Sequence, residues 1–125
     1  MARLSLTLSI LLSWAMPARA HHSFAMFDRD HKIELEGTVR QYRYTSPHPF
    51  IVLEVEKKDG SRVVWNLEGN DSPTVLVRRG WSRTTLKPGD RIRLRIAPLR
   101  SGAPGGAWVP EDVRFSDGSP VVSFK

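Results

Sequence analysis

The 125-residue chain contains no cysteine. This absence excludes disulfides, iron–sulfur clusters, cysteine-attached haem, cysteine-ligated zinc sites and thiol nucleophiles. No serine stands in a Gly-x-Ser-x-Gly pattern, and the glycine-rich stretch at residues 102–106 leads into an expected strand instead of a helix. No catalytic pattern stands out, and we expect a protein that is not an enzyme.

The sequence also lacks an apolar run long enough to form a membrane-spanning helix. The longest one, at residues 4–16, is well short of the roughly 20 residues that a helix needs to cross a bilayer. It follows Arg3 and precedes Ala18 and Ala20, which is the pattern of a secretory signal peptide. We expect residues 1–20 to be removed, leaving residues 21–125 as one periplasmic or secreted domain without stable membrane insertion.

Hydrophobic residues in the remaining chain alternate with polar ones, as in half-buried strands. This pattern predicts strands at residues 32–44, 50–56, 61–68, 91–96 and 107–115. A short helix is expected at residues 73–79, capped by Asp71 or Ser72, and Gly37 is expected to bend the first strand. The order predicts an all-β protein with one short helix, an OB-fold-like five-stranded Greek-key barrel. Its parts would be an N-terminal arm at residues 21–31, the barrel at 32–115 and a C-terminal hairpin or tail at 116–125.

Six short motifs occur in a fixed order along the chain: HHSF, EGTV, PHPF, WNLE, RGW and LKPGD. With these motifs in this order, the sequence resembles a family of small exported bacterial proteins of unknown function. The resemblance covers residues 21–106, and the chain departs from the pattern in its last part, at residues 109–125. It implies an exported OB-like barrel and no established activity.

The four histidines are the main candidates for metal chemistry, and His21 would become the first residue after cleavage. A free N-terminal histidine offers its α-amine and its imidazole Nδ1 as a chelating pair, and nitrogen ligands of this kind favour Cu(II). His48, His31 or His22 could supply a third nitrogen. We therefore predict a Cu(II) site formed by His21, His22 and His48, with no other cofactor. The alternative is a polar tail that binds metal as any His-His peptide does.

His48 stands between Pro47 and Pro49, which restrict the backbone on both sides and hold one imidazole in the loop after the first strand. In OB-folds this loop often borders the ligand-binding face. Nearby aromatic residues could stack on a ligand there, or they could be ordinary barrel packing; they are Tyr42, Tyr44 and Phe50. These features predict a small exported binding protein that holds copper. The alternative is an interaction module without metal that uses the barrel face and residues 42–50 to bind a ligand or another exported protein.

Charged residues add three further expectations. The chain carries a net charge of +6, which in an exported protein favours solubility over nucleic-acid binding, so we expect no nucleic-acid partner. Arg91, Arg93 and Arg95 are expected to form a solvated sheet face that pairs with carboxylates, with polyanion binding as the alternative. Glu68, at the end of the third strand, is expected to cap the helix, with a role in a small polar site as the alternative.

Overall fold

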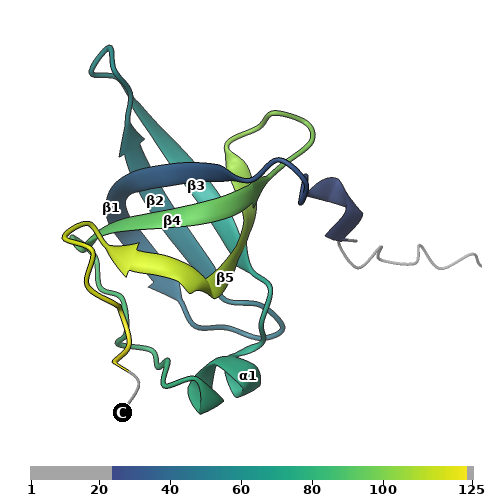
Figure 1. Ribbon diagram of the computed structural model, residues 1–125, viewed down its shortest axis with the longest axis vertical. Helices are drawn as coiled ribbons and strands as arrows, with labels where there is room; N and C mark the ends of the chain where they lie inside the picture. The colour runs from purple at the N-terminus through teal and green to yellow at the C-terminus, as the bar shows by residue number, and fades with distance from the viewer. Residues whose placement is uncertain (1–23, 124–125) are drawn as a thin grey trace, which may run out of the picture.

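The computed structural model describes residues 24–123. One 3-10 turn, five strands and one α-helix follow one another along this part of the chain (Figure 1). They are η1 (Phe24–Met26), β1 (Ile33–Arg43), β2 (Phe50–Glu56), β3 (Arg62–Gly69), α1 (Pro73–Arg78), β4 (Arg91–Pro98) and β5 (Gly105–Phe115). The five strands and α1 lie within two residues of the bounds that the alternating pattern and the capping residues predict, whereas η1 was not predicted.

The strands close into a barrel in the order β1-β2-β3-β5-β4. The β3–β5 contact is parallel and the other four pairings are antiparallel. With α1 between the third and fourth strands at one end of the barrel (Figure 1), this is the predicted OB-fold. The expected fold class is therefore confirmed.

The first strand takes part in both sides of the barrel. Its first half pairs with β4 from Ile33 to Thr38, and its second half pairs with β2 from Thr38 to Arg43. Gly37 lies at the crossover, where a Cβ atom would come within 2.3 Å of the Glu54 carbonyl oxygen. Only glycine allows the two backbones to approach so closely. The irregularity in the β1–β2 register lies nearby, between Val39 and Gln41.

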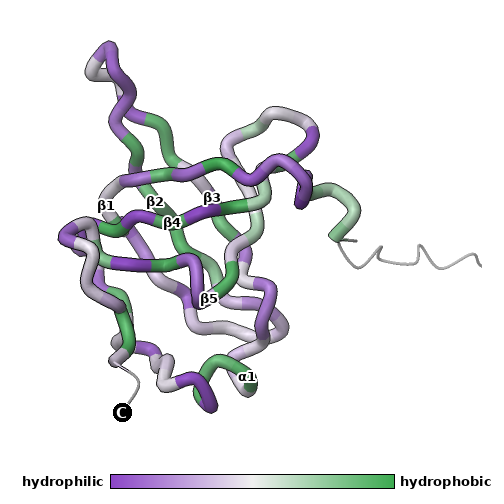
Figure 2. Tube along the Cα trace, viewed as in Figure 1, coloured by the Kyte–Doolittle hydropathy of each residue, from purple (hydrophilic) through white to green (hydrophobic). Residues whose placement is uncertain are grey.

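Alternating side chains point into the barrel and form one continuous core. Figure 2 shows the alternation of apolar and polar residues along β1 and β4. The most deeply buried barrel residues are aliphatic: Val39, Ile51, Leu53, Leu67, Ile92, Leu94 and Ile96. At the α1 end the core is completed by Trp81 and Trp108, whose rings lie 5.4 Å apart, and the Trp108 indole donates to the Leu67 carbonyl at 3.1 Å.

The helix begins as its sequence predicts. Ser72 is the N-cap, and its hydroxyl accepts a hydrogen bond from the Val75 amide at 3.4 Å. Leu76 is fully buried and anchors the helix to the core. The expected capping role of Glu68 is wrong, because Ser72 fills that position and Glu68 remains in β3.

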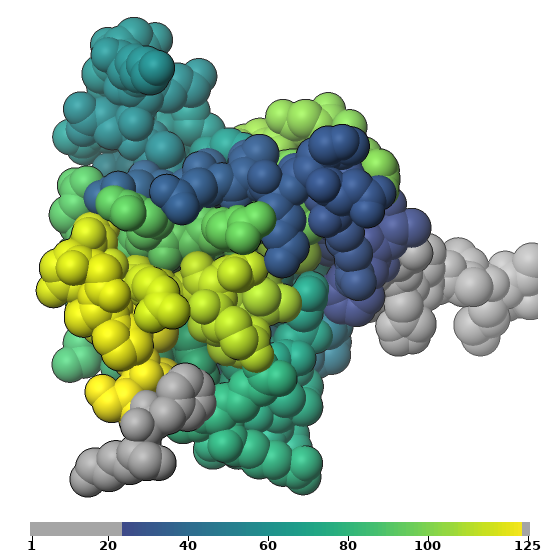
Figure 3. All heavy atoms as spheres, in the orientation of Figure 1, coloured from purple at the N-terminus to yellow at the C-terminus, as the bar shows by residue number. Residues whose placement is uncertain are grey.

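The described part of the N-terminal arm is docked on the outside of the barrel. Phe27 is buried against Ala97 and Ala107, and its backbone pairs with Leu99. The Asp28 amide donates to the Pro98 carbonyl at 2.8 Å. Figure 3 shows the arm lying against the side of the barrel beside the loop that joins β4 and β5. Small residues on β4 and β5 thus make room for an aromatic anchor.

At the other end of the chain, residues 116–119 form a turn after β5. The Phe115 amide donates to the Ser119 carbonyl at 2.9 Å, and Arg114 forms a bridge with Pro120. Val121 and Val122 then pack partly buried against the main core. Across the described residues, no helix is both long and apolar enough to cross a bilayer.

Candidate functional site

The loop that joins β1 to β2 presents His48 at a fixed position. Pro49 is fully buried, and its carbonyl accepts a hydrogen bond from the Gly69 amide at 2.8 Å. A Cβ atom at Gly69 would lie 2.7 Å from the Pro49 ring, so the glycine allows the loop to rest on the end of β3. On the other side the Thr45 hydroxyl donates to the His48 carbonyl at 3.2 Å. The Ser46–Pro47 peptide bond is cis.

The His48 imidazole lies between the N-terminal arm and β3. Its ring meets that of Phe24 edge-on, with centroids 5.5 Å apart. The side chain is 26% exposed, and its Nε2 lies 4.0 Å from Glu68 Oε1, which is beyond hydrogen-bond distance. Nδ1 is buried without a partner among the described residues. Both ring nitrogens are therefore free of hydrogen bonds to this part of the chain.

Glu68 has a carboxylate that is shielded from solvent and lacks a lysine or arginine partner among the described residues. It pairs in the sheet with Phe50 on β2 and Ala107 on β5, and its side chain is only 18% exposed. Among the described residues no lysine or arginine lies within ion-pair distance of it. Its nearest basic group is His48. A charge removed from water in this way is costly unless a cation accompanies it.

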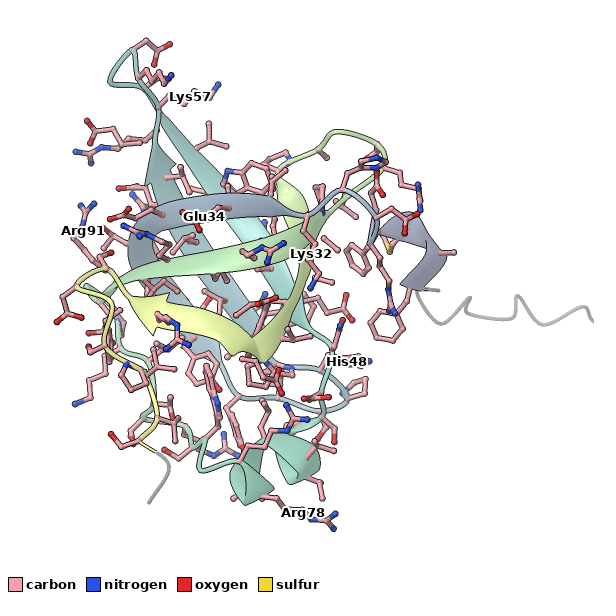
Figure 4. All side chains as sticks on the ribbon, in the orientation of Figure 1. Lys32, Glu34, His48, Lys57, Arg78 and Arg91 are labelled. Atoms are coloured by element: carbon pink, nitrogen blue, oxygen red, sulfur yellow. The ribbon has the colours of Figure 1, made fainter. Side chains whose placement is uncertain are left out.

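These residues line a groove of about 370 Å³. The arm contributes Met26 and Phe27, and the β4–β5 loop contributes Leu99. The remaining lining comes from the β1–β2 loop and the strands that follow it: Thr45, Ser46, Pro47, His48, Phe50 and Glu68. Figure 4 shows His48 on the side of the barrel on which the arm docks. The groove is apolar apart from one imidazole, one carboxylate and two hydroxyls.

Of the three aromatic candidates, only Phe50 borders this groove. Its ring lies 4.9 Å from the Arg43 guanidinium. Tyr42 and Tyr44 pack against the core near the α1 end, where the Tyr42 ring lies 6.2 Å from that of Trp81. The Tyr44 hydroxyl donates to the Pro73 carbonyl at 2.8 Å, and burial raises the pKa of the Tyr42 hydroxyl. The two tyrosines thus take the packing role that the sequence left as an alternative.

The histidines separate into different surroundings. His21 and His22 lie outside the described residues. His31 is exposed and pairs with Asp28 at 3.1 Å, and this hydrogen bond lowers the pKa of the Asp28 carboxyl. It does not line the groove. Within residues 24–123 no three histidine, aspartate or glutamate side chains gather at one point.

The arginine stripe on β4 faces carboxylates on β1. Arg91 lies 3.7 Å from Glu36, and Arg93 lies 3.2 Å from Glu36 and 3.7 Å from Glu34. The nearby Ser116 hydroxyl and the Arg93 guanidinium lower the pKa of the Glu36 carboxyl. The expected pairing on a solvated sheet face is confirmed for Arg91 and Arg93. For Arg95 the described residues offer no ion pair.

The sequence did not assign Glu68 or Phe24 to a common site with His48. Glu68 was expected to cap the helix, with a small polar site as the alternative, and Phe24 had no role. The motifs held a partial signal, since Phe24 belongs to HHSF and Glu68 to WNLE. Only the closed barrel shows that Phe24 and Glu68 both lie beside His48 of the PHPF motif.

Comparisons with known proteins give a family but no activity. The mitochondrial single-stranded DNA binding protein Rim1 of S. cerevisiae is similar in structure with a TM-score of 0.45 and 10% sequence identity. That similarity covers 69% of this chain and 94% of the other. No curated protein matches the chain. The model of a family described as a family of unknown function (DUF6152) matches residues 9–108.

Proposed function

The chain belongs to the family of unknown function DUF6152, and we propose that it is an exported protein that binds Cu(II) at its mature N-terminus. The α-amine and Nδ1 of His21 form the chelating pair, and the His48 imidazole supplies the third nitrogen. The observation that carries this proposal is the contact between Phe24 and His48, with ring centroids 5.5 Å apart.

The contact supports the proposal because Phe24 is the third residue after His21. Three residues of fully extended chain span at most about 11 Å. The proposal requires His21 and His48 to share one metal ion, and this short chain separation between His21 and Phe24 supports it. His22, one residue closer to Phe24, is the alternative source of a nitrogen ligand.

The chemistry of the groups supports copper. An α-amine has a reference pKa near 8 and an imidazole one near 6.5, so both release their protons at small cost near neutral pH. Among divalent first-row metals, nitrogen ligands bind Cu(II) most tightly. The His48 ring nitrogens have no hydrogen-bond partner in the described chain, so no internal bond has to break before a metal binds.

The test is a Cu(II) titration, in competition with a chromogenic chelator, of two proteins that differ by one residue. The first begins at His21, and the second carries one extra glycine before it. Because the extension converts the amine into an amide, we expect it to weaken binding at least tenfold. His48→Gln should also weaken binding, whereas His31→Gln is the matched control and should not. Equal affinity of the first two proteins would overturn the proposal.

A second candidate function is supported by the groove itself. Its volume of about 370 Å³ and its mainly apolar walls suit a small apolar ligand or an apolar side chain of another exported protein. The metal-free protein would then bind a hydrophobic fluorescent probe in the groove, and Phe50→Ala would weaken that binding. The glycine extension separates the two candidates, because it affects copper binding and leaves the binding of the probe unchanged.

A further inference from the structure

We propose that the groove beside His48 binds a small organic ammonium, a molecule with an apolar body and one protonated amine that pairs with the Glu68 carboxylate. This inference rests on the second candidate function, in which the groove holds an apolar ligand, and it names the chemical class of that ligand. It needs neither a metal ion nor any residue outside the range 24–123 that the structure describes.

The Glu68 carboxylate lacks the compensating cation that an equally shielded carboxylate of the same barrel has. The Glu68 and Glu54 side chains are 18% and 16% exposed. Glu54 is paired with the guanidinium groups of Arg40 and Arg62. In the described part of the chain, no lysine or arginine lies within ion-pair distance of Glu68, and its nearest basic group is the His48 imidazole. Because a shielded carboxylate is costly without a partner, this position favours a cation supplied by a ligand.

Arg43 stands in the same row of the sheet as Glu68 but contacts another partner. Arg43 pairs with Phe50 across β1 and β2, and Phe50 pairs with Glu68 across β2 and β3. The Arg43 guanidinium lies over the Phe50 ring, 4.9 Å from its centroid. Phe50 therefore stands between the two charges in this row, and the Glu68 carboxylate remains available to a ligand in the groove.

The walls of the groove favour a ligand whose remaining part is apolar. Five of the lining residues are apolar: Met26, Phe27, Pro47, Phe50 and Leu99. The volume of about 370 Å³ is near the lower end of the range for ligand sites, which favours a small molecule such as a single ring with a short chain. An apolar body on these walls also excludes water from the ion pair with Glu68, and the lower local dielectric strengthens that pair.

The His48 imidazole can accept a second hydrogen bond from the same ammonium. Its Nε2 lies 4.0 Å from Glu68 Oε1, and Nε2 is an acceptor in the tautomer that carries its proton on Nδ1. Two acceptors at this separation can both lie about 2.8 Å from one nitrogen, an ordinary length for a hydrogen bond from a charged donor. A primary ammonium carries three donors, so it can meet both acceptors at once, whereas an alcohol has one donor and no charge.

The position of the groove on the barrel agrees with a binding role. It lies between the β1–β2 loop, which presents His48, and the β4–β5 loop, which contributes Leu99. Strands β2 and β3 contribute Phe50 and Glu68. In OB-folds these two loops and these two strands form the ligand-binding face. Because the charged group in this groove is a carboxylate, the face favours a cation over an anionic ligand.

The experiment compares three ligands that share a phenyl ring and a two-carbon chain: 2-phenylethylamine, the neutral 2-phenylethanol and the anion 3-phenylpropionate. Each is titrated at neutral pH into the protein that begins at His21, kept free of metal with a chelator, and binding is followed by nuclear magnetic resonance. We expect the amine to bind at least tenfold more tightly than the alcohol, and the anion to bind more weakly than the alcohol. This comparison needs no variant, so it tests the charge preference even if a substitution prevents folding.

Glu68→Gln tests the residue that carries the charge, since glutamine keeps the shape of the side chain. We expect the affinity for the amine to fall at least tenfold and the affinity for the alcohol to stay within threefold. Glu54→Gln is the matched control, because Glu54 is equally shielded and lies outside the groove; it should leave both affinities within threefold. The melting temperature of the ligand-free Glu68→Gln protein should equal or exceed that of the parent, because an uncompensated carboxylate does not stabilise the fold.

The outcomes distinguish this inference from the proposed functions. Equal binding of the amine and the alcohol would refute the ammonium preference, while the second candidate function would stand because the groove still binds an apolar ligand. If none of the three ligands binds, both fail, and the copper titration remains a separate test. A preference for the amine that survives Glu68→Gln would refute the role of Glu68. A lower melting temperature of the ligand-free variant would mean that His48 already pairs with Glu68, and it would also overturn the inference.

Discussion

The Phe24 ring is the contact through which the N-terminal arm reaches His48, so Phe24→Ala should weaken copper binding. The barrel should remain intact, because Phe27 and the Asp28–Pro98 hydrogen bond still dock the rest of the arm. An edge-on aromatic pair contributes about 0.5–1.5 kcal/mol. If this contact holds His21 near His48, its loss lowers Cu(II) affinity by about 2- to 13-fold at 25 °C.

The assay is a double-mutant cycle that combines Phe24→Ala with the glycine extension before His21. We expect Phe24→Ala to weaken binding in the processed protein and to have no effect once the extension has removed the amine. The melting temperature of the metal-free variant serves as the control for docking of the arm. Equal Cu(II) affinities of the parent and Phe24→Ala proteins would refute the reasoning, since the contact would then contribute nothing to the position of the N-terminus.

Three further predictions concern the barrel that supports the site. Gly37→Ala should destabilise the fold by about 1–3 kcal/mol or more, as overpacking does, because the new Cβ would lie 2.3 Å from the Glu54 carbonyl oxygen. A denaturant midpoint equal to that of the parent would contradict this prediction. Tyr44→Phe removes the hydrogen bond to the Pro73 carbonyl and should cost about 0.5–1.5 kcal/mol in chemical denaturation, with copper affinity unchanged. Hydrogen bonds from Ser61 hold the pKa of the Asp59 carboxyl below its ordinary value of 3.8. Their contribution is therefore complete above that value and is lost as the pH falls through the lower folded-state pKa, so melting temperatures of Asp59→Asn should fall less steeply in acid than those of the parent.

The sequence alone was sufficient to predict the five strands, α1 and their order along the chain. Alternation identifies a strand because successive side chains face opposite sides, and Ser72 marks the start of α1 because its hydroxyl can accept from an amide of the first turn. Gly37 indicated an irregularity in β1, since a glycine inside a strand often marks one, and the register shift lies nearby, between Val39 and Gln41. These signals are local, and the structure confirms each of them.

The site was only partly predictable because it depends on contacts between distant segments. The prolines around His48 showed that this imidazole is held in place, but not what lies beside it. Glu68 reaches it because β2 and β3 pair with Phe50 opposite Glu68, a register that alternation alone does not determine. Tyr42 and Tyr44 also stand close to His48 in the sequence, yet they face Trp81 and the core.

The position of the arm follows from small residues on the outer surface of the barrel. Ala97 and Ala107 pair across β4 and β5, and together they leave room for the Phe27 ring. Larger side chains at these two positions would displace Phe27 and, with it, the contact between Phe24 and His48. An OB barrel commonly exposes polar residues on its outer face, and here two alanines replace them at the place where the arm crosses. The fold thus brings Phe24 to the loop in which the His48 imidazole is held between two prolines.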